Sequence, residues 1–143
     1  MVLAKGFSGG YAPLGAMLAT ATLVDPLAEE LGFNYAHTAN GNPIACAVGL
    51  AVLERLEQGH LVQHAEALGA HLRGQLLDMA RRVPLIGNVR GQGLLMAVDI
   101  VADRTRRTPL PGETNAPSSI RRIGLDHGLM IYARRTNNGR FGD

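Results

Sequence analysis

The strongest constraint on the fold is a pair of consecutive helices predicted near the middle of the chain. Asn42 followed by Pro43 is typical of a helix start, and this helix is expected to run to about Gln58 and stop at Gly59. Its first ten residues are apolar on every side, which predicts that the helix is buried. A second, amphipathic helix should end before Pro84, because apolar residues recur at helical spacing: Leu61, Ala65, Leu68, Leu72, Leu76 and Met79.

Shorter elements are predicted on both sides of this pair. Asp25 and Pro26 predict the N-cap and first position of a helix that Gly32 closes. A loop is expected over residues 103–117 and a last helix over residues 118–127. Short strands are expected at residues 2–4, 14–20, 94–101 and 129–133. Helices that alternate with short strands in a chain of 143 residues indicate the α/β or α+β class, with room for one domain.

Charge is distributed unevenly along the chain, although the formal net charge is only +2. Residues 1–72 hold two cations and six acids, whereas residues 73–143 hold 12 arginines and six acids. A basic half can bind nucleic acid. Here the arginines are spread over several predicted elements, and Tyr132 and Phe141 are too few aromatic rings for base stacking. We therefore rank a nucleic-acid binder last and expect solvated arginines.

Three further classes of protein are disfavoured. The longest apolar run, residues 44–53, is too short to span a bilayer, and the sequence shows no secretory signal. The single cysteine, Cys46, excludes an intrachain disulfide and fits a reducing compartment, so we expect a cytoplasmic protein with a buried structural thiol. His60, His64 and His71 share one helical stripe, but no carboxylate pair or cysteine completes a ligand set, so we expect no metal site.

The basic residues include 13 arginines but only one lysine, Lys5. An arginine cannot lose its proton in a protein and cannot act as an amine nucleophile, whereas a lysine can. Lys5 opens the turn Lys5-Gly6-Phe7-Ser8-Gly9-Gly10-Tyr11, whose glycines leave room for a bulky planar group and permit tight turns. The alternative is a lysine that lies by chance at the end of a surface strand.

Three segments carry a resemblance to a known family. The first contains this turn and continues as Ala12-Pro13-Leu14-Gly15-Ala16. The second is His37-Thr38-Ala39-Asn40-Gly41-Asn42-Pro43-Ile44-Ala45-Cys46-Ala47, and the third is Val89-Arg90-Gly91-Gln92-Gly93-Leu94-Leu95. In this order they resemble the cofactor-lysine region, the HT-x-x-G-N-P-x-A-C-A stretch and the VRG-x-GL strand of class III aminotransferases. These are pyridoxal-phosphate enzymes of fold type I.

The resemblance implies an α/β fold built from parts of two domains. Residues 1–58 would be the end of the cofactor-binding large domain, and residues 59–143 most of an α+β C-terminal small domain, truncated at both ends. The family's aspartate for the pyridine nitrogen, its phosphate-binding turn and its stacking aromatic lie upstream of the lysine, and we find no match for them here. We therefore expect this chain alone to transaminate poorly.

The resemblance also assigns candidate site residues. Lys5 would hold pyridoxal 5'-phosphate as a Schiff base and then move the proton between substrate and cofactor. Thr38 would bind the cofactor phosphate of the neighbouring subunit of a homodimer. Arg134, Arg135 and Arg140 lie in the region where an arginine meets the substrate carboxylate, and the sequence does not choose among them.

The function implied is transfer of an amino group from an amine or ω-amino acid to a keto acid, although related mutases and decarboxylases share these motifs. The alternative is a non-catalytic remnant of an aminotransferase that acts as a structural or interaction module.

Overall fold

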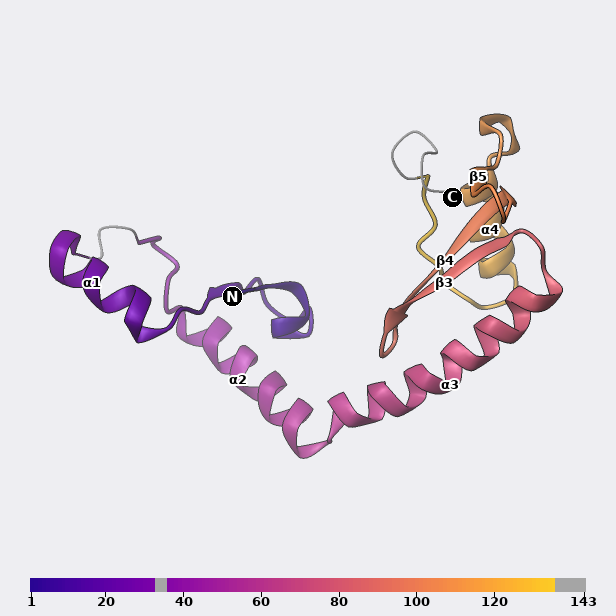
Figure 1. Ribbon diagram of the computed structural model, residues 1–143. Coiled ribbons are helices and arrows are strands. Elements are labelled where there is room, and N and C mark those ends of the chain that lie inside the picture. Colours follow the sequence, from indigo (N-terminus) through magenta and orange to yellow (C-terminus); the bar gives the residue numbers. More distant parts are fainter. Residues whose placement is uncertain (33–35, 136–143) are drawn as a thin grey trace. The chain divides into compact units, whose positions relative to one another are not determined.

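The computed structural model describes residues 1–32 and 36–135 (Figure 1). Helices and short strands are mixed along the chain, which confirms the expected class. The chain divides into two compact units, Met1–Val62 and Gln63–Asp143. An antiparallel pair of strands lies in the first unit and a three-stranded antiparallel sheet in the second.

The first unit opens with two very short strands. β1 (Val2–Leu3) pairs with β2 (Ala16–Met17), so the strand expected over residues 14–20 forms at only two positions. A 3₁₀ turn, η1 (Lys5–Ser8), follows β1 after the single residue Ala4. The pairing of β1 with β2 closes a loop that carries the glycine-rich turn.

The helix α1 (Ala21–Leu31) begins earlier than the sequence indicates. The carbonyl of Thr20 accepts the N–H groups of Leu23 and Val24, so a helical turn is already closed before Pro26. Pro26 therefore lies inside the helix, where its ring removes one backbone hydrogen bond. The predicted end at Gly32 is correct, and this glycine has a φ of 67°.

The helix α2 (Pro43–Gln58) has the predicted bounds. The side chain of Asn42 accepts the N–H of Ala45 at 3.0 Å, and Gly59 follows the last turn. The predicted burial is wrong, because large apolar residues of α2 are exposed, among them Ile44 at 74% and Leu50 at 59%, and the Cys46 thiol is exposed as well. Among the described residues, η1 packs against one side of α2 and cannot cover an apolar surface that extends around it.

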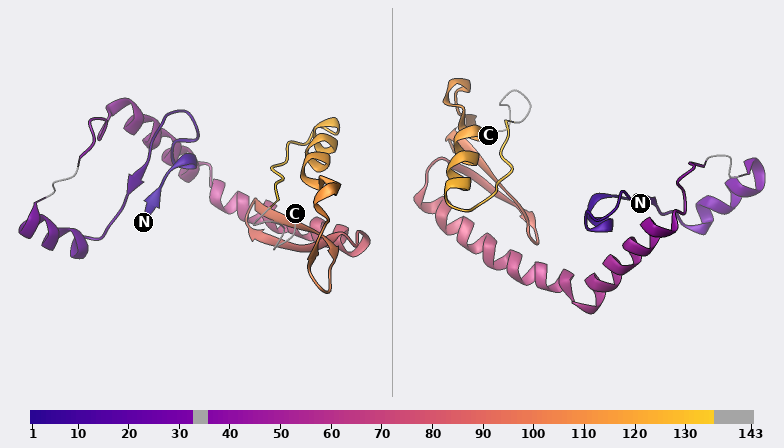
Figure 2. Two further views of the ribbon diagram at one scale, coloured as in Figure 1. Left: turned by 90° about the horizontal axis from the view of Figure 1, so that it is seen from above. Right: turned by 180° about the vertical axis from the view of Figure 1, so that it is seen from behind.

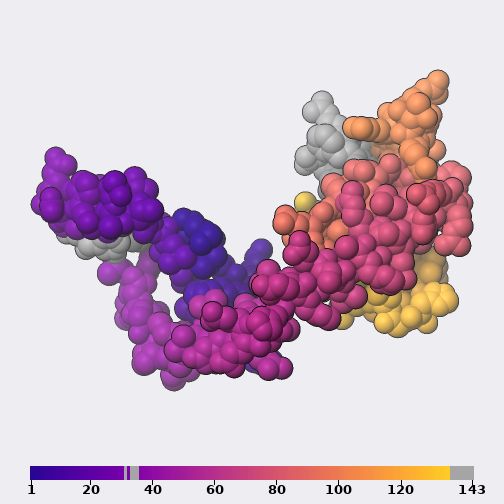
Figure 3. Space-filling model, turned by 60° about the horizontal axis from the view of Figure 1, so that its bottom comes forward, coloured from indigo at the N-terminus to yellow at the C-terminus, as the bar shows by residue number. Residues whose placement is uncertain are grey.

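The second unit is built on α3 (Leu61–Arg82), which ends before Pro84 as predicted. Near its middle, Gly69 lies against the backbone of Gly93, so closely that a Cβ atom there would overlap it. Near its end, the Arg104 guanidinium donates to the carbonyls of Ala80 at 2.5 Å and Val83 at 3.0 Å. Figure 3 shows one side of α3 open to solvent along the helix.

A hairpin of β3 (Ile86–Gln92) and β4 (Leu95–Asp103) supplies most of the core of this unit. Buried apolar side chains come from Ile86, Val89 and Val101 of the hairpin and from Ala116 of α4 (Ala116–Asp126), which lies beside it in Figure 2. Periodicity alone did not predict β3, because polar and glycine residues interrupt its apolar positions.

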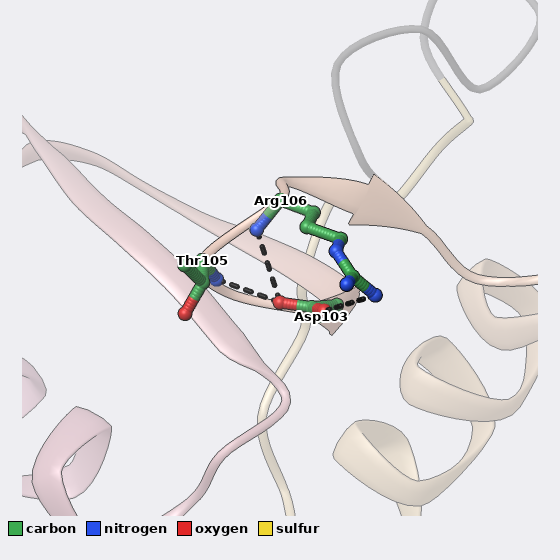
Figure 4. A network of polar contacts seen from close by, with 3 residues as sticks. All are labelled: Asp103, Thr105 and Arg106. Carbon is green, nitrogen blue, oxygen red and sulfur yellow. Dashed lines mark hydrogen bonds and ion pairs between the residues drawn. The ribbon is translucent and has the colours of Figure 1, made fainter.

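The segment expected to be a loop from residue 103 to 117 contains more structure than predicted. The Asp103 carboxylate accepts the N–H groups of Thr105 at 2.8 Å and Arg106 at 3.0 Å and pairs with the Arg106 guanidinium at 3.8 Å (Figure 4). This turn leads β4 into β5 (Thr108–Pro109), which pairs with β4. A 3₁₀ turn, η2 (Gly112–Thr114), then precedes α4.

The strand predicted over residues 129–133 does not form. The backbone groups of this segment pair with α4 instead: the N–H of Leu129 donates to the Gly124 carbonyl, and the Ala133 carbonyl accepts the Arg121 guanidinium, each at 2.7 Å. Ile131 approaches the helix at Gly124, where a side chain would be crowded. The apolar pattern therefore reflects packing against a helix and not sheet pairing.

Candidate functional site

Lys5 has an unusual backbone conformation. Ala4 before it is extended, with φ −161°, whereas Lys5 has φ 55°, in the left-handed region. Such a conformation costs a residue other than glycine about 1–2 kcal/mol. Strain of this kind gathers at functional sites. The structure thus places the single lysine of the chain, with an exposed side chain, at a strained position one residue beyond the end of a strand.

The chain reverses immediately after Lys5. Gly9 and Gly10 have φ values of 60° and 81°, which glycine adopts without steric cost. Between them and the lysine, Ser8 is buried to 2% exposure, and its hydroxyl donates to the Ala12 carbonyl at 2.6 Å. In the sequence, Ser8 stands out only as part of a motif. The signal that could have found it is a lone hydroxyl in a turn otherwise composed of glycine and apolar residues.

A hollow of about 810 Å³ joins the two motifs of the first unit. Its walls are Phe7, Ala12, Pro13, Leu14, Gly15, Ala16, Ala39, Asn40, Gly41, Asn42, Ile44, Ala45, Cys46, Gly49, Leu50 and Leu53. The turn after Lys5 and the loop after Thr38 thus meet at the start of α2. Neither Lys5 nor Thr38 lines the hollow itself, although residues close to both do.

Thr38 lies in a tight loop that leads into α2. The carbonyl of His37 accepts the N–H of Asn40 at 2.9 Å, and the carbonyl of Ala39 accepts the N–H of Asn42 at 3.2 Å. Gly41, with φ 67°, supplies the left-handed residue that this loop needs. The loop therefore presents an exposed hydroxyl ahead of a helix N-terminus, an arrangement that suits an anion.

The donors of the first unit fit a planar cofactor that carries an aldehyde and a phosphate. A primary amine can attach an aldehyde, and Lys5 is the single lysine side chain that could do so. The Thr38 hydroxyl and the α2 N-terminus suit a phosphate. The glycine turn leaves open space at Gly6 and Gly10, where an added Cβ would meet nothing within 4 Å.

The candidate arginines belong to the second unit and differ in their surroundings. The Arg135 guanidinium donates to the carbonyls of Pro111 at 3.2 Å and Leu110 at 3.5 Å and packs on Gly112. Arg134 is exposed. Arg140 lies outside the described residues. The structure thus ties Arg135 to the backbone before η2 and leaves Arg134 on the surface of its own unit.

The arginine of the third motif, Arg90, forms an ion pair within the hairpin. Arg90 on β3 pairs across the hairpin with Asp99 on β4. The hydrogen bond to the Asp99 carboxylate, reinforced by its charge, raises the pKa of the Arg90 guanidinium above its ordinary value. This pair links the two strands of the hairpin.

Two kinds of feature are absent from the described part of the chain. Within residues 1–32 and 36–135, no group of three or more histidine, cysteine, aspartate or glutamate residues could hold a metal ion. In the same part of the chain, no helix has the length and apolar character needed to cross a membrane.

Comparison with known proteins gives a consistent family. The model of the family described as aminotransferase class-III matches residues 1–141. An aminotransferase of Gibberella zeae is 32% identical over 99% of this chain and 28% of its own length. A mitochondrial alanine–glyoxylate aminotransferase 2 homologue of Arabidopsis thaliana is 36% identical over 80% of this chain and 23% of its own length. The chain therefore spans less than a third of these relatives.

Solved structures agree. An amine transaminase from an uncultivated Pseudomonas species, in its PLP-bound form, matches 91% of this chain and 30% of its own with a TM-score of 0.85 and 36% identity. An (S)-enantioselective omega-transaminase from Thermomicrobium roseum matches 93% of this chain and 30% of its own with a TM-score of 0.85 and 31% identity. The expected fold, part of a pyridoxal-phosphate transferase, is confirmed by these matches.

Proposed function

The chain belongs to the class III aminotransferase family, and on this premise we propose that it contributes the cofactor lysine of a pyridoxal-phosphate-dependent transaminase. The proposed reaction moves an amino group from an amine or ω-amino acid to a keto acid, so that the donor becomes a carbonyl compound and the acceptor an amino acid. When bound, the cofactor supplies an electron sink for the substrate carbon. The observation that carries the proposal is Lys5, the single lysine, in a strained turn within the matched region.

Lys5 would have two tasks in this reaction. Its amine attaches the cofactor aldehyde, which an arginine could not do. The same amine could also accept the proton of the substrate carbon and return it. Exposure of the side chain beside an open turn is compatible with both tasks.

Thr38 would bind the cofactor phosphate in a neighbouring subunit. Its hydroxyl lies in the loop before α2, where the helix N-terminus favours negative charge. This role requires a homodimer, and the exposed apolar residues Ile44, Leu50 and Leu53 of α2 support self-association, because apolar surface is stabilised by burial. Light scattering should give a dimer, and a monodisperse monomer at high concentration would contradict this assembly.

Among the arginines, Arg134 is the better candidate for the substrate carboxylate. A guanidinium binds a carboxylate through two parallel hydrogen bonds. Arg135 already donates to the carbonyls of Leu110 and Pro111, whereas Arg134 is exposed. Arg134→Ala should therefore weaken binding of a carboxylate-bearing substrate in titration calorimetry, while Arg135→Ala should mainly lower stability.

We also propose how the chain divides into domains and where the protein works. Residues 1–58 would belong to a cofactor-binding large domain and residues 59–143 to a C-terminal small domain, and the protein would work in the cytoplasm on small amino donors and keto acids. The second candidate function is a non-catalytic interaction module, which the exposed apolar surface of α2 also favours.

The test adds pyridoxal phosphate to the purified chain and records visible absorption. We expect a band that Lys5→Ala removes. Lys5→Arg is the matched variant, because it keeps the charge but cannot attach an aldehyde. A band in both variants as intense as that of the original chain would show that Lys5 does not hold the cofactor and would favour the non-catalytic module.

A further inference from the structure

Ser8 has features that its place in a surface turn does not require. It is 2% exposed, although Gly6, Gly9 and Gly10 around it are exposed. Its hydroxyl donates to the Ala12 carbonyl at 2.6 Å, and the Lys5 carbonyl lies 3.4 Å from the same oxygen. The Ser8 side chain thus lies between the backbone that leaves Lys5 and the backbone that returns at Ala12.

The backbone hydrogen bonds of the turn join only residues that lie close together in sequence. The N–H of Phe7 donates to the Ala4 carbonyl at 3.2 Å, that of Gly9 to Gly6 at 3.0 Å and that of Tyr11 to Ser8 at 3.1 Å. Each of these bonds spans three residues. The Ser8 side chain reaches four residues ahead and ties the start of η1 to the segment that leads back to β2.

This link bears on the strain at Lys5. A left-handed residue other than glycine persists only where its surroundings hold it, because relaxation to negative φ lowers its energy. A buried hydroxyl bond contributes a comparable free energy, and an Ala12 carbonyl left without its donor adds to the loss. The two effects are of similar size, so we expect removal of the hydroxyl to let the Lys5 backbone relax.

We propose that Ser8 is a positioning residue for Lys5: its hydroxyl holds the 5–12 turn and with it the left-handed backbone from which the Lys5 amine reaches the cofactor. This inference rests on the proposed function. The hydroxyl does not touch the reacting atoms in this role. It limits the conformations that the lysine backbone can adopt, and so reduces the entropy lost when the amine is brought to the cofactor.

The sequence offers a direct probe of this turn that needs neither cofactor nor activity. Lys5 is the single lysine, so a lysine-specific endoprotease can cut the chain only after this residue. Cleavage requires local opening, and its rate follows the population of the open form when closing is fast. We expect Ser8→Ala to speed cleavage about tenfold, the change that loss of one buried hydrogen bond produces.

Three other variants make the probe specific. Ser8→Thr keeps the hydroxyl and should return cleavage to within about twofold of the original chain, since the donor is retained. Ser8→Cys has a weak donor of similar size and should be intermediate. Ser119→Ala makes the same chemical change in the second unit and should leave cleavage at Lys5 unchanged. Far-UV circular dichroism checks that each variant folds.

The second readout is the pH titration of the visible absorption of bound pyridoxal phosphate. In Ser8→Ala the midpoint should shift and the band should weaken, and Ser8→Thr should restore both. Unchanged cleavage in Ser8→Ala would overturn the inference, as would faster cleavage with an unchanged titration, because the hydroxyl would then be merely structural. If the original chain gives no band that depends on Lys5, the proposed function fails and the inference falls with it, whatever the cleavage rates.

Discussion

In the second unit, apolar side chains of β3, β4 and α4 are buried together, whereas in the described part of the first unit the buried positions are Ser8 and Gly49. The second unit is therefore stabilised mainly by apolar burial. The first unit relies on short hydrogen-bonded turns around a strained lysine and on a helix that leaves its apolar residues exposed. Lys5 and Thr38, the candidate cofactor-binding residues, thus lie in the unit that buries fewer apolar side chains. Their positions therefore depend mainly on the hydrogen bonds of the turns.

The largest loss of stability is expected from a substitution in the core of the hairpin. Ile86 is 4% exposed, and Ile86→Ala should lower the free energy of unfolding of the second unit by about 3 kcal/mol through lost burial and a cavity. Leu50→Ala in α2 is the matched change, because Leu50 is 59% exposed, and should cost less than about 1 kcal/mol. Urea unfolding checks both, and equal losses would show that the two regions are not held differently.

The next prediction concerns the close approach of α3 to the hairpin. A Cβ at Gly69 would overlap the backbone of Gly93, so Gly69→Ala should lower the free energy of unfolding by about 2 kcal/mol. Gly74 lies in the same helix with open space around it, and Gly74→Ala should raise stability by up to about 1 kcal/mol. Thermal unfolding distinguishes the two, and a stabilising Gly69→Ala would mean that the hairpin does not lie against α3.

The smallest effect is predicted in the first unit, at its helix caps. Asn42→Ala removes the hydrogen bond to the N–H of Ala45 and should destabilise α2 by about 1 kcal/mol. Thr20 precedes α1 without a side-chain capping bond, so Thr20→Ala should change stability by less than half as much. Amide hydrogen exchange in the first turn of each helix measures this difference, and similar exchange in both variants would contradict it.

Local signals in the sequence predicted the parts of the fold that local chemistry decides. Asn42 with Pro43 and the glycine at 59 predicted both ends of α2, because capping involves residues adjacent in sequence. The start of α1 that Pro26 predicted is too late in the chain, because a helical turn closed on the Thr20 carbonyl already lies before Pro26. The segment 129–133 was read as a strand because an apolar pattern does not say whether its partner is a strand or a helix.

The candidate site was predicted in its residues but not in its geometry. Lysine usage and the resemblance identified Lys5 and Thr38 as candidates, and no local pattern could give the φ of 55° at Lys5 or the buried hydroxyl of Ser8. The hydrogen bonds of Arg135 join it to residues more than 20 positions away, so the sequence could not rank the arginines. Long-range contacts of this kind depend on the whole fold.

The central claim is that Lys5 is the attachment point of pyridoxal phosphate. The most direct measurement is reduction of the chain with borohydride in the presence of the cofactor, followed by mass spectrometry of its peptides. Because the chain has one lysine, the account predicts a stable phosphopyridoxyl adduct that peptide fragmentation places on the Lys5 side chain, and no adduct at position 5 in Lys5→Arg. An adduct confined to the terminal α-amine, with Lys5 unmodified, would contradict the claim.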